Sequence, residues 1–192
     1  LLSADHGGFY SKPMLSNALA TGKTADSILS TSSEQMAGQL NITVQPYTRV
    51  ATIDATVDSV YFENGTQLTY SRLVLALGAD PIRLSISGNG ANEMLSINDL
   101  DDYRKFREIL ENKRHIAILG AGLIGCEFAN DLAAKGYQVS VFDLSAQPLG
   151  RLLPAEAGEF FREKLTAAGV NFLLGTTVEK IDKENGHYRL YY

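Results

Sequence analysis

The chain of 192 residues has 45% hydrophobic and 20% charged side chains, the composition of an ordinary globular protein with one large or two small domains. Its formal net charge of −5 argues against non-specific nucleic-acid binding, which requires a basic face. The single cysteine, Cys126, excludes an internal disulfide framework, and the three histidines lack the spacing of metal ligands.

The two ends of the sequence read as interrupted strands, at Leu1–Leu2 and at residues 187–192. We therefore expect the chain to be part of a longer protein. No apolar run reaches membrane-spanning length and no signal peptide is recognisable, so the cytoplasm is the expected location.

The N-terminal half is predicted to combine loops, one short helix and short strands. A helix is expected at residues 32–40, because Ser32 and Gln35 have the spacing of a capping box. Residues 42–76 have the pattern of strands, and Asn64-Gly65 is a strong hairpin signal. An antiparallel β-meander is therefore predicted from residues 42–44, 50–53, 57–62 and 67–70.

Longer elements are predicted from residue 72 onward. A continuous apolar strand is expected at residues 72–77, and a helix at residues 99–113. The apolar residues on one face of that helix are Leu100, Tyr103, Phe106 and Leu110. The remaining elements are expected to be strands at residues 115–119, 137–142 and 170–174, helices between them, and a terminal hairpin of residues 178–181 and 187–190.

Three glycines with dinucleotide-binding spacing follow the strand at residues 115–119. Gly120 permits the tight turn into a helix, Gly122 lets the backbone approach a pyrophosphate, and Gly125 lets the helix pack on the strand. The first helical turn, with Leu123 and Ile124, offers unpaired N–H groups to phosphates. These features predict a dinucleotide site.

An acidic residue completes the motif. Asp143 ends the next strand, where a carboxylate can accept both ribose hydroxyls of NAD and would repel the extra phosphate of NADP. No Arg or Lys follows until Arg151, so NAD is favoured. A glycine triplet alone is a weak signal, but strand, glycines, helix, second strand and acid all occur in order. The alternative is a βαβ unit with an empty crevice.

The order of parts points to a family, because a meander and a Leu-Gly-Ala-Asp-Pro loop precede the glycine motif. In this order the chain resembles the FAD-dependent pyridine nucleotide oxidoreductases. Residues 10–16 are similar to that family's segment beside the flavin, and residues 73–83 to its strand and glycine loop over FAD. Residues 120–127 resemble its NAD motif. Together with residues 149–154, these segments most resemble the rubredoxin reductases of the family.

The resemblance implies an α/β fold of two FAD/NAD(P)-binding, Rossmann-like domains with an antiparallel β-meander, the second dinucleotide domain being inserted in the first. Residues 1–97 would be a partial FAD-binding domain, and residues 98–192 a C-terminally truncated NAD-binding domain. FAD and NAD are the implied cofactors. The family's first glycine motif, for the FAD pyrophosphate, would lie before residue 1.

The resemblance also implies roles for single residues on the FAD side. Asp5 would bind the adenosine ribose of FAD, and Lys12 would lie near the flavin and its phosphates. Val50 would present backbone groups to the adenine. Gly78 and Arg83 would line the FAD cleft.

Glu127 would project from the second turn of the NAD helix between nicotinamide and flavin. Related proteins carry a lysine where this chain has Asn17, which leaves Lys12 as the nearest candidate for a cationic partner. From the residues alone, other interpretations remain open: a loop acid for Asp5, a packing valine for Val50 and a solvated helix glutamate for Glu127.

The implied activity is electron transfer from NADH through FAD to rubredoxin or a similar small iron electron carrier, with no catalytic side-chain acid or base. Residues 1–40 contain no cysteine, and Cys126 is expected to pack inside its helix, so thiol–disulfide chemistry is not expected. The alternatives are an NADH oxidase or ferredoxin-type reductase with another acceptor, and a nucleotide-binding module without turnover.

Overall fold

The computed structural model describes all 192 residues, and the chain forms two compact units. The first unit consists of residues 1–11 and 26–80, and the second of residues 12–25 and 81–192. Each unit therefore contains a piece of the N-terminal 25 residues. No helix combines the length and apolar character needed to cross a membrane.

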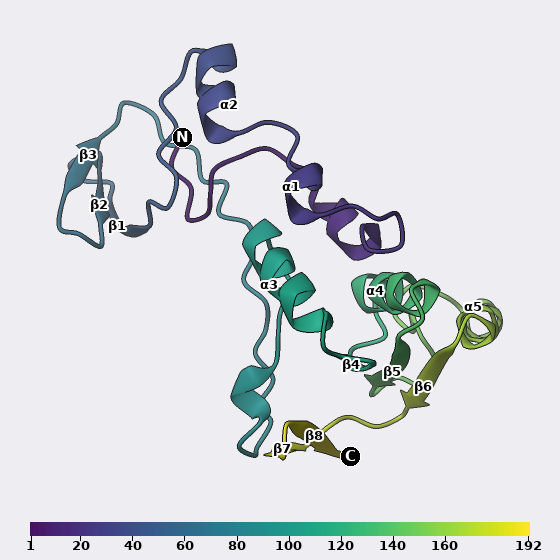
Figure 1. The fold of residues 1–192 in the computed structure, drawn as a ribbon. Coiled ribbons are helices and arrows are strands. Elements are labelled where there is room, and N and C mark those ends of the chain that lie inside the picture. Colours follow the sequence, from purple (N-terminus) through teal and green to yellow (C-terminus); the bar gives the residue numbers. More distant parts are fainter. The chain divides into compact units, whose positions relative to one another are not determined.

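An antiparallel meander forms the sheet of the first unit (Figure 1). It consists of β1 (Val50–Asp54), β2 (Ser59–Phe62) and β3 (Gln67–Thr69), paired in that order. The turn predicted at Asn64-Gly65 joins β2 to β3, with Gly65 at a φ of 81° that favours glycine. The predicted meander is therefore confirmed for its segments at residues 50–53, 57–62 and 67–70.

The first unit also contains short helices. Helix α2 (Ser33–Leu40) begins at the predicted capping box: the Ser32 hydroxyl accepts from the Gln35 backbone N–H, and the Gln35 side chain accepts from the Ser32 N–H. Helix α1 (Ala25–Ile28) was not predicted, because one turn is too short to show a helical period.

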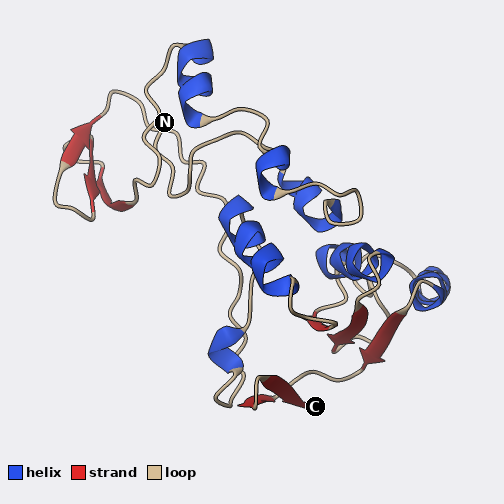
Figure 2. Cartoon of the chain, viewed as in Figure 1, coloured by secondary structure: helices blue, strands red, loops and turns tan.

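Two predicted strands are absent. Residues 42–44 form no strand, and only an isolated parallel bridge joins Leu2 to Gln45. Residues 72–77 lie in the long loop between β3 and the short 3₁₀ helix η2 (Ala91–Glu93), which precedes α3 (Figure 2). Val74 is 86% exposed and Leu77 is 82% exposed. A buried parallel strand needs hydrogen-bonded neighbours and apolar cover on both faces. No strand of this chain supplies them, so the apolar run remains an exposed loop.

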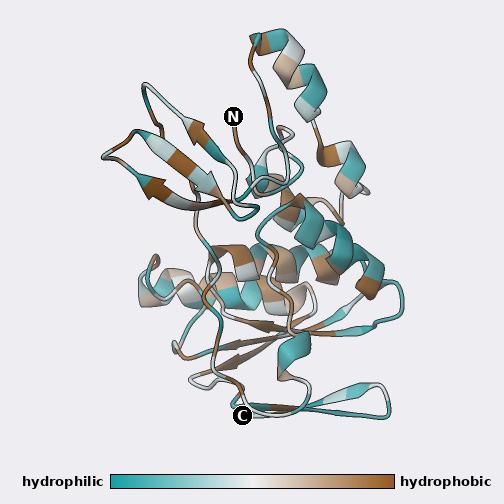
Figure 3. Ribbon diagram, turned by 90° about the vertical axis from the view of Figure 1, so that its left-hand side faces the viewer, coloured by the Kyte–Doolittle hydropathy of each residue, from teal (hydrophilic) through white to brown (hydrophobic).

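The second unit is built on the predicted parallel sheet. Strands β4 (His115–Leu119), β5 (Gln138–Asp143) and β6 (Val170–Leu174) pair in that order. Helices α4 (Leu123–Ala134) and α5 (Ala155–Ala167) connect them and lie on one face of the sheet (Figure 1). Figure 3 shows hydrophobic residues along these strands, and the middle strand, β5, is the most deeply buried of the three.

The other face of the sheet carries a small apolar cluster. Leu119, Phe142 and Leu173 are cross-strand neighbours, since Phe142 pairs with the other two in register. Phe142 packs with buried Val178 and Ile181, and partly buried Ile86 and Leu190 complete the cluster.

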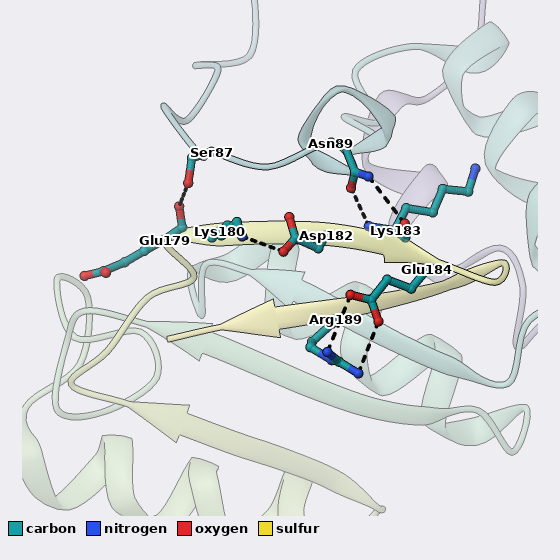
Figure 4. Close-up of polar contacts among 8 residues, drawn as sticks. All are labelled: Ser87, Asn89, Glu179, Lys180, Asp182, Lys183, Glu184 and Arg189. Carbon is teal, nitrogen blue, oxygen red and sulfur yellow. Dashed lines mark hydrogen bonds and ion pairs between the residues drawn. The ribbon is translucent and has the colours of Figure 1, made fainter.

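The predicted terminal hairpin consists of β7 (Lys180–Glu184) and β8 (His187–Tyr191). The segment around Ser87 and Asn89 lies along β7 (Figure 4). The Asn89 side chain bonds both backbone groups of Lys183, and the Ser87 N–H and hydroxyl donate to the Glu179 carbonyl. The segment around Ser87 thereby adds a third hydrogen-bonded backbone segment beside the two strands of the hairpin.

Helix α3 (Leu100–Leu110) has the predicted buried face and begins at Asp99, whose side chain accepts from the Asp102 N–H. The Phe106 ring meets the Phe128 ring of α4 edge-on at 5.8 Å between centroids. A short 3₁₀ helix, η1 (Lys12–Asn17), also packs in this unit, and was not predicted.

Replacing Phe106 by alanine tests the contact between α3 and α4. The substitution removes a 7%-exposed ring and leaves a cavity beside Phe128. We expect the free energy of unfolding to fall by about 3–5 kcal/mol. Lys105→Ala, on the exposed side of the same helix, should change it by less than about 0.5 kcal/mol. Chemical denaturation measures both, and equal losses would contradict this account of the core.

Candidate functional site

The glycine turn lies between β4 and α4, as the sequence predicted. Gly120 has a φ of 110°, which residues with a side chain rarely adopt, so glycine is needed for the turn. Gly122 is the N-cap of α4 and supplies no side chain to the N-terminal N–H groups of the helix. A Cβ built at Gly120 or Gly122 would meet nothing within 4 Å. The turn therefore leaves open space beside unpaired donors, which suits a phosphate.

Gly125 is constrained in a different way. A Cβ at this position would lie 2.0 Å from the Gly120 carbonyl oxygen and 3.5 Å from the Ile118 side chain. Only hydrogen fits here, so the helix begins directly against the end of the strand. This is the packing role expected of the third glycine.

Asp143 binds the turn from the end of β5. Its carboxylate accepts from the Ala121 N–H at 2.6 Å and from the Ser145 N–H at 2.7 Å. Partial burial raises the pKa of Asp143, but these bonds, the Ser145 hydroxyl and the positive charge of Arg151 outweigh it, so the pKa lies below its usual range. Each oxygen accepts one backbone N–H, and because a carboxylate has about four acceptor sites, lone pairs remain for a ribose hydroxyl.

Leu123 and Ile124 form the exposed first turn of α4, with 55% and 64% of their surfaces accessible. The opposite side of the helix is buried and includes Cys126, which is 2% exposed. Burial, and to a lesser extent the charge of Asp143, raise the pKa of the Cys126 thiol to about 11. Cys126 therefore packs as a thiol, as the sequence analysis expected.

Glu127 occupies the second turn of α4 and meets η1. The Ser16 hydroxyl donates to the Glu127 carboxylate at 2.5 Å. The Lys12 ammonium instead donates to the Asn98 side-chain oxygen at 2.7 Å. The suggested pairing of Lys12 with Glu127 is therefore not formed, and a neutral hydroxyl partners this carboxylate.

The roles of Ser16 and Asp131 were not predicted from the sequence. Asp131 lies one turn beyond Glu127, is 3% exposed, and accepts from the backbone N–H groups of Leu19 and Ala20 at 2.9 and 2.7 Å. An acid among the apolar residues of an otherwise buried helix face is the sequence signal that could have identified it.

Asp5 and Val50 lie on neighbouring segments of the first unit. The Asp5 carbonyl accepts from the Tyr47 N–H at 2.8 Å, and the Ser3 carbonyl accepts from the Thr48 N–H at 2.7 Å. These bonds place the Asp5 loop beside the chain that enters β1 at Val50. Because β1 is an edge strand, one side of its backbone has no strand partner.

The Asp5 carboxylate is already hydrogen-bonded. It accepts from the Ser3 hydroxyl at 2.5 Å and from the Gly7 N–H at 2.9 Å. Partial burial raises the pKa of Asp5, but the hydrogen bonds from Ser3 and Gly7 outweigh it, so the pKa lies below its usual range. The neighbouring His6 accepts the Gly8 N–H at Nδ1, and its buried Nε2 has no partner.

The remaining candidates for FAD are exposed. Gly78 has a φ of 69° in open space, and Arg83 is exposed in the loop that follows. Lys12 and Arg83 belong to the second unit, and Asp5, Val50 and Gly78 to the first. Within the units, the structure thus brings Asp5 near the start of β1 and assembles the glycine turn with Asp143.

Comparisons with known proteins agree with this geometry. A family model described as pyridine nucleotide-disulphide oxidoreductase matches residues 1–191. A rubredoxin-NAD(+) reductase of Acinetobacter baylyi is 46% identical over 190 residues, which cover 96% of this chain and 48% of the relative. The chain thus spans about half the length of the curated relatives it matches.

Solved structures have the same fold. An NADH:rubredoxin oxidoreductase from Clostridium acetobutylicum superposes with a TM-score of 0.79 at 25% identity, over 92% of this chain and 46% of that one. A covalent putidaredoxin reductase–putidaredoxin complex gives 0.85 at 27% identity, over 96% of this chain and 45% of the other. The expected α/β fold with a parallel sheet is confirmed.

Gly122→Ala and Gly125→Ala form a matched pair that separates binding from folding. Gly122 has a φ of −75° and open space, so alanine there should change the unfolding free energy by less than about 0.5 kcal/mol. Its methyl group should still obstruct the pyrophosphate and weaken NADH binding about tenfold or more. Gly125→Ala should instead cost about 1–3 kcal/mol of stability, since its Cβ meets the Gly120 carbonyl. Denaturation and NADH titration give the two readouts, and equal behaviour of the variants would contradict the assignment.

Proposed function

Because the chain belongs to the pyridine nucleotide-disulphide oxidoreductase family, we propose that it carries the NADH site and part of the FAD site of an electron-transfer flavoprotein. The electrons pass from NADH through FAD to rubredoxin or a similar small iron protein. Residues 98–192 form the NAD-binding domain in this proposal, and residues 1–97 contribute to the FAD-binding domain.

The observation that carries the proposal is the glycine turn, which has open space beside it and is held by the Asp143 carboxylate. Gly120 and Gly122 leave room beside the unpaired N–H groups of α4, while Asp143 orients the turn and keeps lone pairs for a ribose. Leu123 and Ile124 present the first helical turn to the phosphates. Each group is held by backbone contacts, so the site is formed before a ligand binds.

The FAD side is proposed from residues that fit the cofactor without forming a complete site. Asp5 offers a carboxylate to the ribose, the edge of β1 at Val50 offers backbone groups to the adenine, and the orphaned His6 Nε2 offers a buried donor. Lys12, Gly78 and Arg83 are each proposed to contribute a further contact to FAD. When bound, FAD supplies the redox chemistry, taking two electrons from NADH and releasing them singly to an iron centre.

Two observations support a small iron protein as the acceptor. The names of the Acinetobacter relative and of the Clostridium structure both specify rubredoxin, and the putidaredoxin reductase was solved in a covalent complex with putidaredoxin. The single thiol, Cys126, is buried and its pKa is raised, so it is unsuited to disulfide exchange. A lone reduced cysteine also supports the cytoplasm as the proposed location.

The colour of the complete protein tests the proposal. It should be yellow with bound FAD, bleach when NADH is added without oxygen, and then reduce rubredoxin, which is followed by its visible absorption. Bleaching without rubredoxin reduction, together with oxygen consumption in air, would favour an NADH oxidase. A colourless protein that still binds NADH would be a nucleotide-binding module.

Asp143→Asn tests the preference for NADH over NADPH. The amide removes the charge that repels a 2′-phosphate and leaves the cation Arg151, whose charge already acts on Asp143. We expect the ratio of kcat/KM for NADH to that for NADPH to fall about tenfold or more, equivalent to about 1.4 kcal/mol. Glu156→Gln, at an exposed site in the first turn of α5, loses the same charge and should leave the ratio unchanged. An unchanged ratio in Asp143→Asn would contradict the role of Asp143.

A further inference from the structure

A buried carboxylate outside the proposed nucleotide site holds the segment of residues 12–25 on α4. Asp131 is 3% exposed, and its two oxygens accept the consecutive backbone N–H groups of Leu19 and Ala20, at 2.9 and 2.7 Å. These N–H groups belong to the turn that follows η1 and are more than 110 residues away in sequence. A single helix residue therefore fixes a distant piece of chain.

The environment of Asp131 makes this contact costly to break. The adjacent helix residues Phe128, Ala129 and Leu132 are buried and apolar. Burial raises the pKa of Asp131, while the bonds from Ala20 and Leu19 and the charges of Arg107 and Lys135 partly offset that rise. Removing the carboxylate would leave two backbone N–H groups without their acceptor in a poorly solvated place.

The same segment carries the partner of Glu127. Ser16 lies three residues before Leu19, is 4% exposed, and donates its hydroxyl to the Glu127 carboxylate. Glu127 and Asp131 are four residues apart and therefore lie on one side of α4. Asp131 accepts backbone N–H groups of the turn that follows η1, and Glu127 accepts the side-chain hydroxyl of Ser16 in η1 itself.

Both ends of the segment are also bound to neighbouring residues of the second unit. Lys12 donates to Asn98 at 2.7 Å, and Arg107 donates to the Lys23 carbonyl at 2.7 Å. These contacts restrain the ends, but neither of them touches the turn itself. The bonds to Asp131 hold the turn on α4, where the buried side chains of Leu15, Ala18 and Leu19 also pack.

We propose that Asp131 is a positioning residue, which holds the turn at Leu19 and Ala20 so that Ser16 fixes the Glu127 carboxylate between the nicotinamide and flavin sites. The inference rests on the proposed function and on the place between nicotinamide and flavin that the family resemblance implies for Glu127. A carboxylate held in one rotamer has no ordering cost when NADH arrives, and small misplacements near a reacting centre reduce rates strongly. Asp131 touches neither cofactor in this proposal and acts through Ser16.

Asp131→Asn is the first test, made in the complete FAD-loaded protein. The amide keeps one acceptor oxygen but presents an NH₂ group to the second backbone N–H, so the turn shifts. We expect the rate of anaerobic bleaching at saturating NADH to fall about tenfold, while the Kd for NADH changes less than about twofold. Asn130→Ala, at the exposed neighbour on α4, is the matched control and should leave both values unchanged.

A double-mutant cycle distinguishes positioning from general damage. In a Glu127→Gln background, Asp131→Asn should cause no further loss of rate, since it acts through Glu127. Ser16→Ala should reproduce the loss of rate with Asp131 intact, which keeps the test valid if Asp131→Asn folds poorly. If the loss of rate in the double variant equalled the product of the losses in the two single variants, the proposal would be overturned. A change in Asp131→Asn that affected only stability and the Kd for NADH would also overturn it.

Hydrogen exchange provides a readout that does not need turnover. The amides of residues 18–22 should exchange about tenfold faster in Asp131→Asn than in the unaltered protein. In Asn130→Ala the exchange rates of the same amides should be unchanged. Unchanged exchange in Asp131→Asn would overturn the structural part of the inference. Failure of NADH to bleach the unaltered protein would instead overturn the proposed function, and with it the role in catalysis, independently of the exchange result.

Discussion

The close approach of α4 to the end of β4 is the constraint on which the second unit depends. Because Gly125 has no side chain, the helix can begin against the Gly120 carbonyl oxygen, where a Cβ would lie at 2.0 Å. This contact brings the N-terminus of α4 directly to the edge of the sheet. It also sets the direction of the helix, so that one side packs on the sheet and another meets α3 through Phe128.

Helix α4 consequently makes three kinds of contact, each through a different set of its residues. Its first turn is exposed and offers donors to a phosphate. Its buried face includes Phe128 and Leu132, which stabilise the unit by apolar contact. Its third side carries Glu127 and Asp131, which bind the segment of residues 12–25. The candidate nucleotide site and the contacts that hold residues 12–25 thus lie on one helix.

Carboxylates organise the site by accepting backbone N–H groups rather than by forming ion pairs. Asp143 holds the glycine turn at Ala121, and Asp131 holds the turn at Leu19 and Ala20. Asp5 does the same at Gly7 in the first unit. Bonds of this kind fix loops at a defined geometry, because a charged acceptor strengthens each hydrogen bond.

The sequence by itself determined the elements whose signals are local. Apolar periodicity identified α3 and its buried face, turn residues identified both hairpins, and the glycine spacing with Asp143 identified the candidate site. Only the tertiary structure decided that residues 72–77 form no strand here and that Ser16, not Lys12, bonds Glu127. It also revealed Asp131. Strand pairing and hydrogen bonds across more than 100 residues depend on which distant groups meet, and no local pattern of residues records that.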